Sequence, residues 1–125
     1  MSPLLLALLA GAGGVGAGLR YLVDTAVRRR IGGRSEYPWG TLLINLSGSF
    51  LLGVITGLAT RIGHQPWTTV AGTGLLGGYT TFSTASVESV RLLQQRRIGP
   101  ALLSGLGMLV GCVLAAFAGL LLGRL

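Results

Sequence analysis

The sequence has little charge, one cysteine and one histidine. Only 10% of its 125 residues are charged, whereas a soluble domain is usually about a quarter charged. The single cysteine, Cys112, excludes an intrachain disulfide, and one thiol is too few ligands for a metal site. The three acidic residues lie at or beyond the ends of the apolar segments. A hydrolase and a proton-coupled transporter are therefore poorly supported, and we expect no enzymatic activity.

The sequence is rich in apolar residues, glycine and arginine. Half of it is hydrophobic, its mean hydropathy is +0.71, and it contains 22 glycines without a Gly-X-Y period. This composition predicts a small integral membrane protein and excludes collagen. The net charge of +7 comes entirely from arginine. Because the arginines cluster between apolar segments, as in cytoplasmic loops, we expect no nucleic-acid binding.

Four apolar stretches are long enough to cross a bilayer, which takes about 20 residues in a helix. Pro38, Pro66 and Pro100 precede the second, third and fourth stretches, where a missing N–H costs little. The first is interpreted as a retained helix, because no Lys or Arg precedes it as in a signal peptide. We therefore predict an all-α membrane protein with a single four-helix transmembrane domain over residues 1–125. The expected spans are 4–22, 40–59, 67–87 and 101–122.

The arginines are distributed unequally between the two sides of the membrane. Eight lie at or after the ends of spans one and three, and only two belong to the other side. The positive-inside rule then places loops one and three in the cytoplasm and both termini outside, for a multi-pass protein of the cell membrane. The eight are Arg20, Arg28, Arg29, Arg30, Arg34, Arg91, Arg96 and Arg97, and the two are Arg61 and Arg124.

Each span also carries glycines four residues apart, which are candidate faces for close helix packing. Tight packing leaves little room for a wide pore inside one subunit, so a pathway is expected along an interface with a second subunit. The pairs are Gly14 and Gly18, Gly53 and Gly57, Gly74 and Gly78, and Gly107 and Gly111.

Polar side chains form a stripe along the second span. Thr41, Asn45 and Ser49 follow one another at intervals of four residues, and therefore share one face of a helix. Polar groups inside a span usually face protein or water rather than lipid. The stripe is consistent either with hydrogen bonds between helices or with the lining of a polar pathway.

The third span contains the least helical segment, GLLGGYTTFSTAS at residues 74–86. Two glycines followed by two threonines favour a break over residues 77–83, or else a kink in which the hydroxyls satisfy the helix backbone. Backbone groups freed by a break must line a cavity, bind an ion or contact protein. Phe82 lies among the hydroxyls, where the positive edge of its ring can stabilise a small anion or where the ring simply packs.

These blocks resemble the Fluc/CrcB family of small fluoride channels. GTLLINLSGSFLLG in span two and GLLGGYTTFSTAS in span three carry the resemblance, which covers nearly the whole chain. It implies a dimer of subunits in opposite orientations that exports fluoride passively along the subunit interface. It implies fluoride contacts from Asn45, Thr81 and Ser83, the ring edge of Phe82, and a polar track extended by Thr41. Ser49 is a further candidate for lining the path.

The same resemblance implies two further sites. The carbonyl oxygens of Gly77 and Thr80 would bind a structural sodium ion on the two-fold axis between the subunits. Arg20 matches the arginine that the family carries at the end of the first helix, where it either attracts anions to a vestibule or anchors the interface.

Two positions depart from the family pattern. Ala85 replaces the second phenylalanine of a TTFSTF motif, and Met108 occupies a turn of the fourth span that is commonly polar. A dimer of identical opposed subunits also requires a sequence that inserts both ways, which an eight-to-two arginine bias disfavours. A heterodimer with a related, oppositely inserted subunit is therefore expected over a homodimer.

Two other functions compete with that of a channel. One is a non-conducting assembly subunit of a heterodimeric channel, which the two departures keep open. The other is a small multidrug exporter, but such exporters use a glutamate in the first helix and residues 4–22 contain no acid.

Overall fold

The computed structural model describes residues 2–31, 38–63 and 65–125, and every regular element in these ranges is a helix. The chain forms four helical units. The first two are the uninterrupted helices α1 (Pro3–Ile31) and α2 (Trp39–Ile62). The third unit contains α3 (Pro66–Thr69), the π-helical segment η1 (Val70–Leu76), α4 (Gly77–Tyr79) and α5 (Ser83–Gln94). The fourth contains α6 (Ile98–Leu102), the π-helical segment η2 (Leu103–Gly107) and α7 (Met108–Gly123).

Three of these units are long and apolar enough to cross a membrane, judged by length and composition over the described ranges. The all-helical fold and three apolar spans are therefore confirmed. The third unit is interrupted, so its role as a span stays a prediction. The three spans are Pro3–Ile31, Trp39–Ile62 and Ile98–Gly123.

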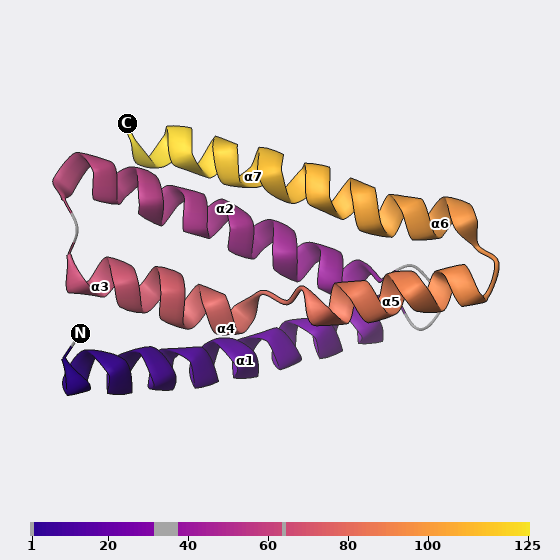
Figure 1. Cartoon of the computed structure of the whole chain (residues 1–125), viewed down its shortest axis with the longest axis horizontal. Coiled ribbons are helices and arrows are strands. Elements are labelled where there is room, and N and C mark those ends of the chain that lie inside the picture. Colours follow the sequence, from indigo (N-terminus) through magenta and orange to yellow (C-terminus); the bar gives the residue numbers. More distant parts are fainter. Residues whose placement is uncertain (1, 32–37, 64) are drawn as a thin grey trace.

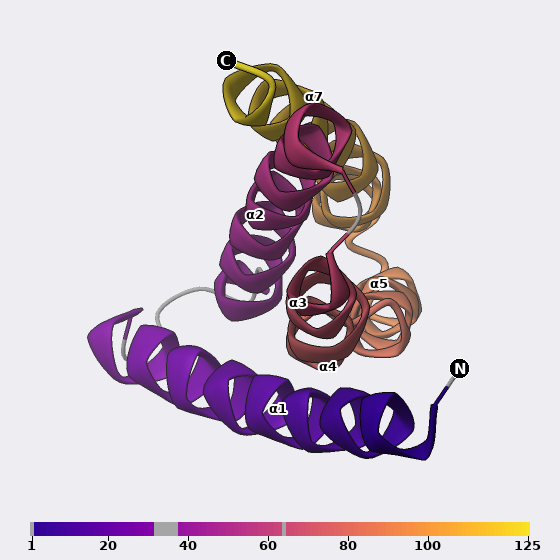
Figure 2. The same ribbon diagram turned by 90° about the vertical axis from the view of Figure 1, so that its left-hand side faces the viewer.

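The units run side by side along the long axis of the molecule. Figure 1 shows α7 beside α2, and α1 beside the third unit. In the view of Figure 2, α1 crosses beneath the other helices, while α2 and α7 remain paired. The start of α1, the end of α2, the start of α3 and the end of α7 lie at one end of the bundle, and the connection from α5 to α6 lies at the other (Figure 1). Four successive crossings of a membrane require this arrangement.

The first helix is longer than its apolar stretch. The sequence predicts a span over 4–22 and a polar break from Asp24 onwards, but α1 continues to Ile31. Asp24 and Arg28 form an ion pair of 3.1 Å between Oδ2 and Nε, at the i, i+4 spacing that supports a helix. Arg20, which was expected at the end of the first helix, therefore lies well inside it.

Helices α2 and α7 approach each other backbone to backbone at glycines. A Cβ atom on Gly53 would overlap the carbonyl oxygen of Ala116, and one on Gly119 would overlap that of Phe50. Gly57 makes the same kind of close approach one turn further along α2. The close-packing face expected at Gly53 and Gly57 is thus confirmed.

The third unit packs on α1 in the same way. A Cβ atom on Gly78 would overlap the carbonyl oxygen of Gly13, and one on Gly74 would lie 3.0 Å from the Cβ of Ala12. The pair expected on α1 is wrong for contacts within the chain, because nothing lies within 4 Å of a Cβ on Gly14 or Gly18. A shift of one residue turns a helix by about 100°, so neighbouring glycines face different partners.

The pair expected on the fourth unit is not a backbone contact either. A Cβ on Gly107 would meet only Leu103 of the same unit, and one on Gly111 would lie 3.2 Å from a side-chain carbon of Leu46. Close contact on this unit is made further along the chain, by the glycines of α7 that face α2.

The outer surface is strongly apolar. On α7, for example, Leu109, Val113 and Phe117 are each more than half exposed. Such a surface requires lipid or protein around it, because soluble monomers rarely expose large contiguous apolar patches. The apolar side chains that are buried within the chain are Ile44, Ala59, Leu76, Leu92, Ala101 and Met108.

Candidate functional site

The third unit is broken over residues 80–82, between α4 and α5. Thr80 is extended, with φ −80° and ψ 159°, and the helix resumes at Ser83. Of the two alternatives that the sequence allowed, a break and a kink, the structure has the break. It is shorter than the expected 77–83, since Gly77–Tyr79 remain helical. The glycine at 78 serves the contact with α1 rather than the break.

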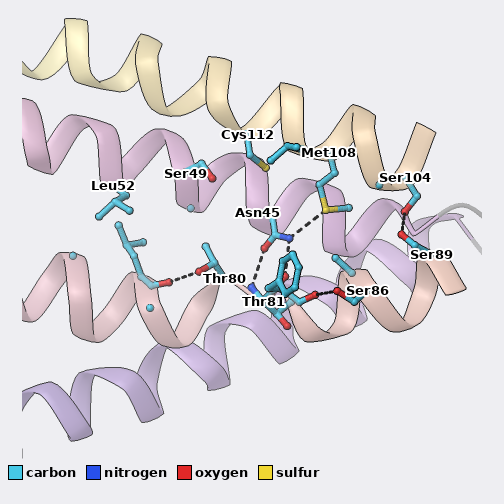
Figure 3. Close-up of a pocket in the computed structure, with 18 of the residues that line it drawn as sticks. Asn45, Ser49, Leu52, Thr80, Thr81, Ser86, Ser89, Ser104, Met108 and Cys112 are labelled. Atoms are coloured by element: carbon cyan, nitrogen blue, oxygen red, sulfur yellow. Dashed lines mark hydrogen bonds between the residues drawn. The ribbon is translucent and has the colours of Figure 1, made fainter. Parts of the chain in front are cut away.

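Asn45 of α2 satisfies the backbone at the break. Its Nδ2 donates to the carbonyl oxygen of Thr81, and its Oδ1 accepts from the Thr81 N–H, each at 2.9 Å (Figure 3). Asn45 and Thr81 are both buried, with 9% of their surface exposed. A buried backbone group without a partner is destabilising, so this two-point contact allows a break in an apolar environment.

Hydroxyl groups complete the two helix ends at the break. Thr81 Oγ1 accepts a hydrogen bond of 3.2 Å from the N–H of Thr84, which pairs one of the free N–H groups in the first turn of α5. Ser83 Oγ lies 3.4 Å from the same hydroxyl, so both candidate hydroxyls lie at the break. Thr80 Oγ1 donates instead to the carbonyl oxygen of Leu76, at 3.0 Å.

A cavity of about 750 Å³ opens beside the break, between α2, the third unit and the fourth unit (Figure 3). Asn45 and Ser49 line it one turn apart on α2, as expected of a polar stripe. None of the described residues that line it is charged. The cavity therefore offers uncharged hydrogen-bonding groups among apolar walls. Its polar lining residues are Asn45, Ser49, Thr73, Thr80, Thr81, Ser86, Ser89 and Ser104.

The fourth unit presents Ser104, Met108 and Cys112 to this cavity on successive turns. Ser104 is only 1% exposed, and its hydroxyl lies 3.4 Å from that of Ser89. Met108 is 5% exposed, and its sulfur accepts a hydrogen bond of 3.3 Å from Asn45 Nδ2. Asn45 therefore donates one N–H to the carbonyl of Thr81 at the break and the other N–H to the sulfur of Met108.

Phe82 lies at the break, on the rim of the cavity. It is 87% exposed, so its ring is not packed in the core of the chain. Ala85, at the place where the resemblance has a second phenylalanine, also lines the cavity. The two positions expected to carry the aromatic pair thus face the same space, and only one of them carries a ring.

Arg20 and Thr41 lie at a second, smaller hollow of about 210 Å³. Thr81 lines both hollows. Thr41 Oγ1 donates to Glu88 Oε1, so it does not continue the lining formed by Asn45 and Ser49. The two hollows share Thr81, so the polar track extended by Thr41 stays a prediction.

Glu88 is the polar contact that sequence reasoning missed. It was placed beyond the third span, but α5 runs from Ser83 to Gln94 and contains it. The signal was present, because no glycine or proline interrupts the sequence between these two residues.

The fold and the site define a class of protein: a small helical membrane protein with a broken helix beside an uncharged cavity, the kind of element that lines ion and solute pathways. The family described as CrcB-like protein, Camphor Resistance (CrcB), matches residues 6–120. The chain belongs to this family.

Proteins that match this chain over nearly its full length have similar names. "Fluoride-specific ion channel FluC 1" of Leifsonia xyli is 49% identical over 126 residues, which cover 100% of this chain and 90% of the relative. "Fluoride-specific ion channel FluC 2" of Nitrobacter hamburgensis is 43% identical, over 90% of each chain. "Fluoride-specific ion channel FluC" of Phenylobacterium zucineum is 43% identical, over 94% of each chain. Family membership favours the channel class over the multidrug exporters.

Proposed function

We propose that this chain is a subunit of a fluoride-specific ion channel of the cell membrane, which exports fluoride passively and lowers its concentration in the cytoplasm. The observation that carries the proposal is the helix break held by Asn45 beside an uncharged cavity. The similarity to proteins named as fluoride-specific channels, over 90% or more of this chain, supports the choice of ion.

The physical case rests on the kind of donor at the site. A conducting path must bind its ion strongly enough to replace water and weakly enough to release it. Uncharged amide and hydroxyl donors meet this requirement for an anion. The positive edge of a phenyl ring adds a weak attraction without a full charge. Asn45, Ser49 and Phe82 supply these three kinds of group around one cavity.

The remaining site residues take roles around this path. Thr81 and Ser83 contribute hydroxyls at the break, where their oxygens are 3.4 Å apart. Thr41 lines the second hollow and extends the polar route through its contact with Glu88. Arg20 lines the same hollow and attracts anions toward the break from that side.

Resemblance to the family implies a structural sodium ion held by the carbonyl oxygens of Gly77 and Thr80. The residues fit such a site. In an unbroken helix these carbonyls would accept from the N–H groups of Thr81 and Thr84. Those N–H groups bond instead to Asn45 Oδ1 and to Thr81 Oγ1, so the break frees both oxygens. Carbonyl oxygens are suitable ligands for a hard cation.

The path requires a second subunit, since Phe82 is exposed on the rim of the cavity. We propose a dimer of oppositely oriented subunits, and a heterodimer in preference to a homodimer. Among the described arginines other than Arg20, six lie in the last turn of α1, in α5 or between α5 and α6, and two lie at the ends of α2 and α7. Arg34 lies outside the described residues. We propose that the arginine-rich end faces the cytoplasm and that both termini face outward.

A second candidate function is a non-conducting assembly subunit. Ala85 and Met108 favour it, because both line the cavity where an aromatic ring and a polar side chain would serve conduction.

Fluoride efflux from liposomes tests the proposal. Purified protein is reconstituted into vesicles loaded with potassium fluoride, and release is followed with a fluoride electrode, with chloride-loaded vesicles as the control. Fluoride release well above that of protein-free liposomes supports the channel. If this protein releases fluoride on its own, the proposal that it needs a different partner subunit is overturned. The channel is contradicted if fluoride is not released by this protein alone and is not released after co-reconstitution with a related subunit of opposite arginine bias.

A further inference from the structure

Asn45 has one hydrogen that no backbone group uses. A side-chain amide offers two N–H donors on nitrogen and one acceptor oxygen. Thr81 takes the oxygen and one of the two donors. Because the oxygen must face the Thr81 N–H, the amide cannot turn over without losing both bonds. The second N–H is thereby directed at the cavity wall, where the sulfur of Met108 lies 3.3 Å from Nδ2.

We propose that the Met108 sulfur competes with the permeating anion for this N–H, and so sets the fluoride concentration at which the site fills. The inference rests on the proposed function, since it takes fluoride as the ion that Asn45 binds. Met108 is a positioning residue in this scheme: its sulfur accepts the N–H of Asn45 in the absence of the ion and releases it when the ion binds.

The chemistry of the two acceptors makes the exchange possible. A thioether sulfur is a weak acceptor, whereas hydrogen bonds to an anion are about twice as strong as those between neutral groups. Methionine has three rotatable side-chain bonds and adapts easily to its surroundings. Both Met108 and Asn45 line the cavity of about 750 Å³, so an ion there can reach the amide as the sulfur moves away (Figure 3).

The sequence makes this contact easy to observe. Asn45 is the only asparagine of the chain, and Met108 is the only methionine besides Met1. Protein labelled with ¹⁵N only at asparagine therefore gives one side-chain NH₂ signal pair. That pair is recorded in lipid nanodiscs during titration with sodium fluoride, and with sodium chloride as the control salt.

The informative variant is Met108→Leu, which keeps the volume and removes the acceptor, an exchange that cores usually tolerate. The matched control is Leu106→Met, the reverse exchange on the same helical unit at a side chain that is 60% exposed and outside the cavity lining. We expect the fluoride midpoint to fall about fivefold in Met108→Leu, the ratio that corresponds to one weak hydrogen bond. We expect it to be unchanged in the control.

An equal or higher midpoint in Met108→Leu overturns the inference, even if the wild-type protein conducts fluoride in liposomes. The inference is also overturned if fluoride shifts the amide signals neither in the wild-type protein nor in Met108→Leu, because there is then no ion for the sulfur to compete with. The lowered midpoint supports the inference even if the reconstituted chain proves to be a non-conducting subunit, since the titration measures binding and not flux.

Discussion

Asn45→Ala is expected to destabilise the protein far more than its size suggests. The change removes two hydrogen bonds of 2.9 Å and leaves the N–H and carbonyl of Thr81 without partners at a buried break. Hydrogen bonds between membrane helices contribute about 0.6–1.7 kcal/mol each, and an unsatisfied buried group costs about 1–3 kcal/mol. We therefore expect a loss of about 2–4 kcal/mol in the free energy of unfolding, allowing for water in the open cavity.

Reversible unfolding in mixed micelles of increasing SDS fraction, followed by circular dichroism, measures this loss. Ser49→Ala is the matched control: Ser49 lies one turn away on α2 and lines the same cavity, but its hydroxyl makes no hydrogen bond within the described ranges. It should stay within about 0.5 kcal/mol of the wild-type protein. If Asn45→Ala is as stable as Ser49→Ala, Asn45 does not hold the break and the reasoning fails.

Four further substitutions, one of them a control, separate packing from transport. Phe82→Leu should reduce fluoride flux at least about tenfold through loss of the ring edge, yet leave stability within about 0.5 kcal/mol, because the ring is 87% exposed; equal flux would refute its role. Gly53→Ala, whose Cβ overlaps the backbone of α7, should destabilise by about 1–3 kcal/mol, and Gly18→Ala, which meets open space within the chain, should not. Thr41→Val should cost about 0.6–1.7 kcal/mol through the lost bond to Glu88, and an unchanged unfolding midpoint would contradict that contact.

Composition and hydropathy predicted much of the fold. The ends of the second and fourth spans were expected at residues 40–59 and 101–122 and lie at Trp39–Ile62 and Ile98–Gly123, because prolines and apolar runs mark them clearly. The end of α1 was missed by nine residues, 22 against 31. Hydropathy reports where a helix leaves an apolar medium and not where it ends, and a charged helix stabilised by an i, i+4 pair continues past that point.

Contacts between distant segments were harder to predict. The spacing of four between glycines was the same at residues 14 and 18 as at 53 and 57, but only the second pair meets another backbone within the chain. Spacing identifies a face of a helix, whereas the direction of that face depends on the packing of all four units. The same limit applies to Thr41: its spacing from Asn45 is regular, but its hydroxyl bonds to Glu88 on α5.

The site places two demands on one side chain. The break frees the N–H and the carbonyl of Thr81, and an apolar environment requires that both be paired. A hydroxyl has only one hydrogen to donate, and a carboxylate donates none, so neither satisfies both groups and keeps an N–H for an anion. A side-chain amide does so, because it has one acceptor and two donors and the break uses one of each. The residue that stabilises the interrupted helix is for this reason also the residue that can present a donor to a halide.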